Sequence, residues 1–406
     1  MSKKFNQSII KSVIYSGTSS IVSYIILIII ARLYPTEATA HYLYIVTIGI
    51  LLVLLLDIAS EQSLVHYSKS NKYDIFSIWA RMCTYKLILV SIILILYFIL
   101  SYSISIELPI IAILMLIPVL YTGPVFEYYS HNTSYAKIVL AERLFFLTII
   151  GILSQISHNI NYVIYSYSAV SFLSLLIQYL YLRLFLRLSI DNNFSFRFTE
   201  YARTYLALYL VIISQLIYGN ISRIVIDAKI GVIAFGAITL ALQIVNAISI
   251  VQSQVDRHIR PIIIQSIHEN NWFELRNILR RYALHYLLPI IFGCVSISLL
   301  STHIIHLLFG PKWTEAANAL RFASPLIFTI ACMRFIDILV VPLRATKMNL
   351  FVNMATAIFL FLLLWFNPRQ DLESYVLLIV LSQALHVAFM AAYVYARAGY
   401  VMRQSV

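Results

Sequence analysis

The segment "HLLFGPKWTEAANALRFASPLIF", His306–Phe328, places a short polar turn between two long apolar runs. Gly310 tolerates the left-handed backbone at a helix end, and Pro311 blocks continuation of that helix. Trp313 suits a membrane–water interface, and Thr314 can cap a following helix. The segment therefore predicts two membrane-spanning helices joined by a turn at the membrane surface, and nothing in it requires catalysis.

The chain on either side of this turn has the composition of a membrane protein. Of its 406 residues, 61% are hydrophobic and only 11% are charged, whereas soluble proteins carry roughly 25% charged residues. Apolar runs of about 20 residues cross the hydrocarbon core as helices, because lipid-exposed backbone must satisfy its own hydrogen bonds. We therefore predict an all-α, polytopic membrane protein. About twelve spans are predicted, at residues 9–31, 39–59, 80–101, 108–128, 137–156, 161–182, 203–223, 231–254, 281–301, 316–342, 349–366 and 374–396.

The basic residues are unevenly divided between the two sides of the membrane. If Lys3 and Lys4 are cytoplasmic and the spans alternate, most lysines and arginines fall on the cytoplasmic side. The opposite side holds only a small set: Arg32, Arg223, Lys229, Lys312 and Arg369. This bias predicts that both termini are cytoplasmic and that Gly310 lies at the outer surface. The net charge of +12 is thus an orientation signal and does not indicate nucleic-acid binding.

Two polar stretches, both on the cytoplasmic side, divide the chain. The stretch at 183–202 separates the spans six and six, which predicts an N-terminal six-helix bundle at 1–190 and a C-terminal one at 191–406. The stretch at 255–280 has apolar residues at helical spacing followed by arginines, which favours an amphipathic helix on the inner membrane surface. A partly folded connector is the alternative.

Three segments resemble turns of the bacterial O-antigen and polysaccharide flippases, within the multidrug/oligosaccharidyl-lipid/polysaccharide exporter superfamily. They are "LLFGPKWTEAANALRFASPLIF" (307–328), "ARLYPTEATAHYLYI" (31–45) and "SRIVIDAKIGVIAFGAITLALQIVNAISIVQSQVDRHIRPII" (222–263). In the second, Ala40 and His41 stand where the family pattern leads us to expect a glycine. The resemblance lies in structural turns and covers no substrate signature.

The resemblance implies two six-helix bundles around a central cavity, working by alternating access. It implies a bacterial inner-membrane flippase that moves polyprenyl-pyrophosphate-linked oligosaccharide, such as an O-antigen unit, from the cytoplasmic to the periplasmic leaflet. Membrane lipids are implied partners, with polysaccharide polymerase and chain-length proteins as candidates, and no cofactor is expected. Two alternatives remain open: an ion-coupled multidrug exporter of the same superfamily, and a membrane-embedded polysaccharide polymerase, which the short outer loops disfavour.

Polar residues within the predicted spans are the candidate site residues, because a charge at membrane depth costs about 2.5–3.5 kcal/mol and usually faces the protein interior. The candidates for a substrate-binding, cationic cavity are Arg334, Arg143, Lys86, Arg321, Gln243 and Asn246. The residues predicted to form structural or ion-coupling pairs are Asp337, Glu142, Asp57, Glu61 and His386.

Each candidate also has a structural interpretation. Arg334 either faces the cavity or forms a neutral pair with Asp337 at i+3. Lys86 and Arg321 can each line the cavity or extend to the nearest interface. Asp57 and Glu61, at i and i+4, repel each other, so we expect them either to form a salt bridge with a basic residue or to bind a coupling proton. His386 can relay protons or make a helix contact.

No signature of an enzyme is present. No glycine precedes a lysine, so the chain has no phosphate-binding P-loop, and it lacks the Gly-x-Ser-x-Gly and His-Glu-x-x-His motifs. Its three cysteines show no metal-ligand spacing. We expect a transporter without cofactor or metal, in which basic side chains receive an anionic cargo.

Overall fold

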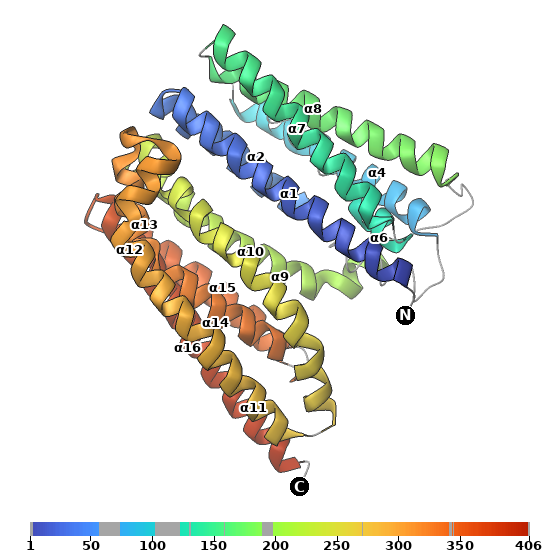
Figure 1. Cartoon of the computed structure of the whole chain (residues 1–406), viewed down its shortest axis with the longest axis vertical. Coiled ribbons are helices and arrows are strands. Elements are labelled where there is room, and N and C mark those ends of the chain that lie inside the picture. Colours follow the sequence, from blue (N-terminus) through green and yellow to red (C-terminus); the bar gives the residue numbers. More distant parts are fainter. Residues whose placement is uncertain are drawn as a thin grey trace. The chain divides into compact units, whose positions relative to one another are not determined.

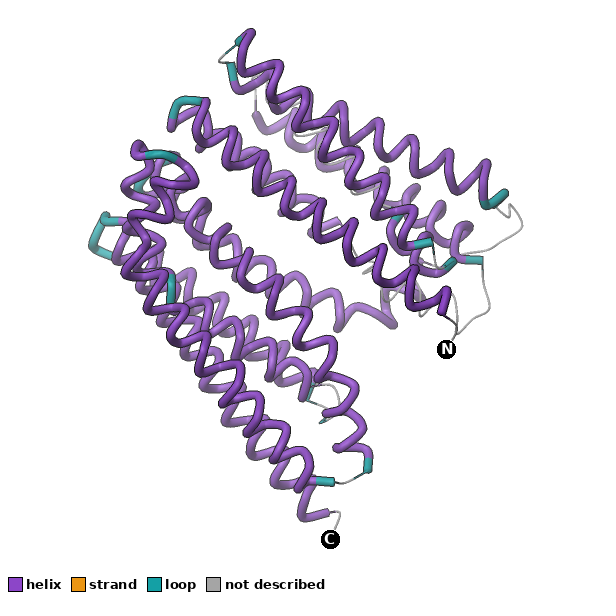
Figure 2. The backbone as a smooth tube through the Cα atoms, viewed as in Figure 1, coloured by secondary structure: helices purple, strands orange, loops and turns teal. Residues whose placement is uncertain are grey.

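The computed structural model describes residues 3–56, 74–101, 122–129, 131–157, 159–188, 198–269, 271–340, 343 and 345–404. Within these ranges all regular structure is helical, as Figure 2 shows. The chain forms two compact units, Met1–Tyr209 and Leu210–Val406. This division falls inside the helix Phe198–Lys229, labelled α9, whereas the boundary predicted from sequence precedes that helix.

The first unit is a bundle in which α1 packs along α7 and α7 packs along α8 (Figure 1). The last helix, α8, also contacts α2 and continues into a short π-helical turn, η1. The elements of this unit before α9 are α1 (Lys3–Leu33), α2 (Thr36–Leu56), α4 (Ile75–Ser101), α6 (Gly123–Tyr128), α7 (Asn132–Ile156), α8 (Ile160–Leu180) and η1 (Tyr181–Phe185).

In the second unit, α10 packs on α13 and α14, while α16 packs on α13, α14 and α15. The helix α11 joins α12 through a π-helical turn, η2, so that they form one continuous rod (Figure 1). Besides most of α9, the elements are α10 (Val232–His268), α11 (Trp272–Tyr282), η2 (Ala283–Leu287), α12 (Leu288–Phe309), η3 (Pro311–Trp313), α13 (Thr314–Ala323), α14 (Pro325–Val340), α15 (Thr346–Trp365) and α16 (Leu372–Gln404).

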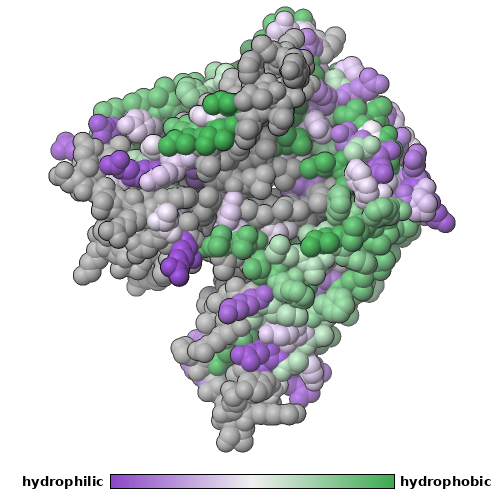
Figure 3. All heavy atoms as spheres, turned by 180° about the vertical axis from the view of Figure 1, so that it is seen from behind, coloured by the Kyte–Doolittle hydropathy of each residue, from purple (hydrophilic) through white to green (hydrophobic). Residues whose placement is uncertain are grey.

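Several of these helices are long and apolar enough to cross a membrane. Within the described ranges there are six, or seven if the bent pair α13–α14 forms one span. Helices α2, α7, α9 and α10 occupy four further predicted spans. The predicted span 108–128 lies mostly outside the described residues. Large apolar side chains are exposed on the helices, and Figure 3 shows broad apolar patches on one face. An all-α, polytopic membrane protein is confirmed.

Two helix predictions were wrong. The predicted span 316–342 is broken into α13 and α14, which are bent by 47°, because Pro325 supplies no backbone N–H to continue the first helix. The stretch 255–280, predicted to hold one amphipathic helix, is divided between two elements. Helix α10 runs to His268, and α11 starts anew at Trp272. Asn271 starts it, since its side chain accepts a hydrogen bond from the Glu274 backbone N–H.

The turn at Gly310 matches its prediction only in part. The helix α12 ends at Phe309, and Gly310 has φ 95°, a backbone conformation that favours glycine. The Trp313 side chain is buried in the protein at 1% exposure, and its position at a membrane–water interface stays a prediction. Thr314 was predicted to cap α13, but its hydroxyl donates to the Pro311 carbonyl at 3.1 Å instead.

Because Gly310 has a positive φ, we expect Gly310→Ala to lower the free energy of unfolding by about 1–3 kcal/mol. Gly293→Ala is the matched control, since Gly293 lies within α12 and a Cβ there meets no atom within 4 Å. Alanine at Gly293 should leave stability unchanged or raise it by up to about 1 kcal/mol. Thermal unfolding in detergent measures both, and equal losses in the two variants would contradict the explanation from backbone strain.

Candidate functional site

The polar core of the first unit centres on Glu142 and Arg143 of α7. Arg143 precedes Phe146 and Ile150 by three and seven residues, and both of those are fully buried, so α7 turns Arg143 toward the bundle interior. The side chains of Arg143 and Glu142 are 26% and 10% exposed, and Arg143 Nη1 lies 4.0 Å from Glu142 Oε1. The two opposite charges are therefore held together inside the bundle.

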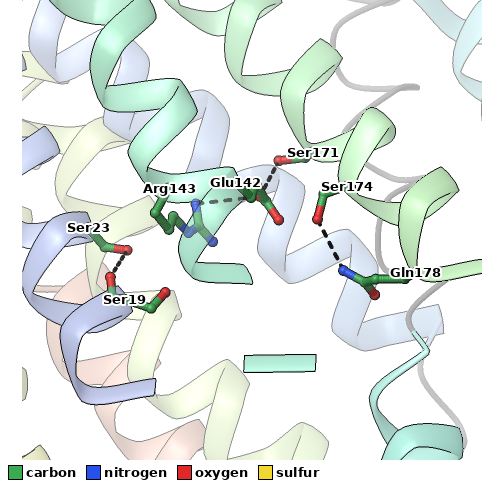
Figure 4. Close-up of polar contacts among 7 residues, drawn as sticks. All are labelled: Ser19, Ser23, Glu142, Arg143, Ser171, Ser174 and Gln178. Carbon is green, nitrogen blue, oxygen red and sulfur yellow. Dashed lines mark hydrogen bonds and ion pairs between the residues drawn. The ribbon is translucent and has the colours of Figure 1, made fainter. Parts of the chain in front are cut away.

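Each of the two charges also has its own contact on α8. The Ser171 hydroxyl donates a hydrogen bond to Glu142 Oε1 at 3.0 Å (Figure 4). The Arg143 guanidinium carbon lies 5.8 Å from the centre of the Tyr167 ring, a cation–π distance. The two side chains therefore have separate contacts on α8, to Ser171 and Tyr167, in addition to their ion pair with each other. The α7–α8 interface thus orients both charges.

A second polar network lies on the same buried face of α8. Gln178 Nε2 donates to Ser174 Oγ at 3.1 Å, and the Thr122 hydroxyl donates to Gln178 Oε1 at 2.6 Å. All three residues are buried. Buried side-chain amides need such partners, because an unpaired polar group costs its full desolvation energy. This network ties the segment before α6 to α8.

We expect Thr122→Val to lower the free energy of unfolding by about 1–3 kcal/mol, because Gln178 Oε1 loses its donor while the side-chain volume stays the same. Thr148→Val is the control, since the Thr148 hydroxyl is exposed and bonds only to the Leu144 carbonyl of its own helix. Chemical or thermal unfolding in detergent compares them. A Thr122 variant as stable as the Thr148 variant would show that the network contributes no net stability.

The serines of α1 face this core without joining it. Ser19 is buried and Ser23 is half-buried, and the Ser23 hydroxyl donates to the Ser19 carbonyl at 3.0 Å (Figure 4). The Ser20 hydroxyl likewise donates to the Ser16 carbonyl. These hydroxyls are satisfied within their own helix, which favours helix packing as their role.

In the second unit, Arg334 and Asp337 of α14 are both half-buried. Within the described ranges Arg334 forms no ion pair or hydrogen bond, so it is not neutralised there by Asp337. A half-buried guanidinium without a described acidic partner is a candidate contact for an anion. His386 is buried at 3% exposure on α16, on the same face as buried Ser382.

The remaining candidates are scattered. Gln243 and Lys86 are half-buried, whereas Asn246 and Arg321 are exposed. The backbone carbonyl of Arg321 accepts hydrogen bonds from the Ser298 and Ser324 hydroxyls at 3.1 Å each, so the residue has a structural contact. Asp57 and Glu61 lie outside the described residues. Their predicted roles stay predictions.

Sequence reasoning missed a buried polar row on α15. Asn349, Asn353 and Thr356 are all buried, and Asn353 Nδ2 donates to Asn349 Oδ1 at 2.9 Å. Their spacing of four and three residues places them on one helical face, which is a signal that the sequence offers. Asn353 Nδ2 also donates to the Asn349 carbonyl and the Thr356 hydroxyl to the Val352 carbonyl, so these donors find partners within α15.

A polar cluster at the predicted cytoplasmic end of the first unit was also missed. Asp74 accepts a hydrogen bond from the Tyr129 hydroxyl at 2.8 Å and caps α4 through the Ser77 backbone N–H at 2.9 Å. Burial, followed by the hydrogen bond to Asp74, raises the pKa of Tyr129. The phenol therefore stays protonated as the donor to Asp74. Tyr181 in η1 bridges His131 and Ser134 at 3.2 and 2.9 Å.

No group of His, Cys, Asp or Glu among the described residues has an arrangement that could hold a metal ion. The half-buried basic side chains of the described helices include Arg143 and Arg334, and such groups can bind an anionic ligand.

The helices define a polytopic, all-α membrane protein. No protein-family model matches the sequence, and no curated protein matches it either. Similarity is found among solved structures, at 11–14% sequence identity, which is informative about the fold alone.

Three of these structures illustrate the likeness. An inward-facing multidrug resistance MATE family transporter of the MOP superfamily is 11% identical with TM-score 0.70, and the match covers 96% of each chain. The lipid II flippase MurJ, inward closed, is 12% identical with TM-score 0.71 over 95% of this chain and 87% of that one. A MOP superfamily transporter from Pyrococcus furiosus is 12% identical with TM-score 0.62, covering 98% and 96%. The chain has the fold of these transporters.

Proposed function

We propose that the protein is a flippase for polyprenyl-pyrophosphate-linked oligosaccharide, such as an O-antigen unit. It moves this cargo from the cytoplasmic to the periplasmic leaflet of the bacterial inner membrane by alternating access, with both termini cytoplasmic. Membrane lipids surround it, and polysaccharide polymerase and chain-length proteins are candidate partners.

The observation that carries the proposal is the presence of half-buried arginines at membrane depth. Arg143 in the first unit has one acidic neighbour, and Arg334 in the second has none among the described residues. Planar guanidinium groups bind phosphate oxygens in a bidentate manner. A pyrophosphate carries the negative charge that would make these positions favourable, whereas a cationic drug would be repelled by them.

The similar solved structures include both a lipid II flippase and multidrug transporters, with TM-scores of 0.71 and 0.70. They support the transporter class and leave the cargo to be decided by the chemistry of the site. An ion-coupled multidrug exporter is the second candidate. It is favoured by Glu142, a half-buried carboxylate held by the Ser171 hydroxyl, which is a group that can take up a cation or a proton.

Binding measurements on the purified protein in neutral-lipid nanodiscs test the proposal. The probes are undecaprenyl pyrophosphate, its uncharged alcohol, and tetraphenylphosphonium as a lipophilic cation. We expect the pyrophosphate to bind at least about tenfold more tightly than the alcohol and to lose that advantage in Arg143→Gln. If the protein binds tetraphenylphosphonium and does not prefer the pyrophosphate over the alcohol, the result would contradict the flippase and favour the multidrug exporter.

A further inference from the structure

The helix α11 has two faces of different chemistry. On one face Leu275 is buried in a core that includes Met333 and Ile336 of α14, and Tyr282 is buried as well. The Tyr282 ring stacks on Phe335 with centroids 4.5 Å apart. This face anchors α11 firmly to its own unit.

The opposite face of α11 is basic and apolar at once. Arg276, Arg280 and Arg281 are exposed, and Phe273 is 77% exposed. Phe273, Arg276 and Arg280 follow one another at helical spacing of three and four residues, and exposed Leu284 follows at the next step. The apolar side chains therefore flank the arginines at both ends of the face.

These three arginines have no partner among the described residues of the protein. None of them forms an ion pair or a hydrogen bond within the described ranges. The acid nearest in sequence, Glu274, is engaged in capping, because it accepts a hydrogen bond from Asn271 Nδ2 at 2.9 Å. Three cations on one face thus lack a counter-charge in the described part of the chain.

The rod of α11, η2 and α12 places this face at the edge of the membrane. Trp272–Phe309 is a single helical segment of 38 residues, about 57 Å long at the helical rise, whereas the whole bilayer is about 40–45 Å thick. The 22 residues of α12 alone match the hydrocarbon core. Since Gly310 lies at the predicted outer surface, α11 extends through the headgroup layer on the cytoplasmic side.

We propose that the exposed face of α11 is a binding site for the headgroups of anionic phospholipids in the inner leaflet. The guanidinium groups of Arg276, Arg280 and Arg281 bind the phosphate oxygens, while Phe273 and Leu284 enter the boundary with the acyl chains. The site is independent of the cargo and holds whether the protein moves oligosaccharide or drugs. Its buried face packs against α14, the helix that carries Arg334.

Native mass spectrometry of the full-length protein in neutral detergent tests this site. The probes are phosphatidylglycerol and phosphatidylcholine with identical acyl chains. Wild type should bind phosphatidylglycerol at least about tenfold more tightly. The variant Arg276→Gln/Arg280→Gln/Arg281→Gln should lose this preference, since each basic residue near an anionic surface contributes about fivefold.

The control variant is Lys11→Gln/Arg183→Gln/Arg203→Gln, which removes three exposed charges from the same predicted side of the membrane. It should keep the preference for phosphatidylglycerol. A third variant with lysine at the three α11 positions should retain most of it. Loss of preference in both glutamine variants, or in neither, would overturn the site. Displacement of the lipid by millimolar glycerol phosphate would show that the arginines bind soluble phosphate instead, and would also overturn it.

Discussion

Arg143→Gln is expected to reduce translocation of lipid-linked oligosaccharide by about 100-fold at normal protein levels. The change removes the half-buried guanidinium that lies 4.0 Å from Glu142 and near the Tyr167 ring. Truncating one member of a buried charge pair costs about 2–5 kcal/mol, which corresponds to at least tens-fold in rate if the same charge holds the cargo. Transport assays with membrane levels matched by immunoblot measure the effect.

Glu142→Gln is the matched control for Arg143→Gln. Its amide oxygen still accepts the hydrogen bond from Ser171, so the α7–α8 contact is kept while the negative charge is lost. If the cargo is anionic, translocation should stay within about threefold of wild type. If the protein is an ion-coupled exporter, this variant should be inactive, and Arg143→Gln should retain drug export. The pair of variants therefore separates the two candidate functions.

Arg334→Gln is expected to lower translocation by at least about tenfold while leaving the unfolding temperature equal to or above that of wild type. An arginine at membrane depth costs about 2.5–3.5 kcal/mol, and within the described ranges this one has no ion pair or hydrogen bond to lose. If Arg334 has only a structural role, Arg334→Gln should instead lower the unfolding temperature, and transport should be retained once folding is rescued.

Arg369→Gln is the control for this second prediction, because Arg369 is exposed in the loop between α15 and α16. It removes the same charge from the same unit without touching a candidate site. Its transport and unfolding temperature should match those of wild type. Thermal unfolding in detergent and transport in cells give both quantities. Equal loss of transport in the two variants would indicate that transport depends on the net charge of the protein and not on the position of Arg334.

Much of the fold could be predicted from the pattern of apolar runs. Continuous apolar runs predict helices, because backbone in lipid must form its own hydrogen bonds. Gly310 and Pro311 predicted the end of α12, where Gly310 adopts a positive φ. The break before α14 was missed, although Pro325 within an apolar run was a signal for it. The packing of α11 could not be predicted, because it depends on long-range contacts with α14, where Leu275 joins a buried core and Tyr282 stacks on Phe335.

The candidate site could be predicted only as a set of residue types. Arg143 and Glu142 were identified because charges are expensive in lipid, but their partners Tyr167 and Ser171 depend on how α7 packs against α8. The Gln178 network depends on Thr122, which is far away in sequence. Whether Arg334 forms an ion pair with Asp337 could not be predicted either, because i+3 spacing permits a contact between the two side chains without requiring one.

The most direct test of the proposed function is the leaflet distribution of polyprenyl-pyrophosphate-linked oligosaccharide in a strain that lacks this protein and any redundant flippase but assembles the cargo. If the protein is the flippase, the cargo should accumulate on the cytoplasmic leaflet, and wild type and Glu142→Gln should relieve this accumulation while Arg143→Gln at matched levels should not. Cargo that still reaches the periplasmic leaflet without the protein would show that the protein is not its flippase.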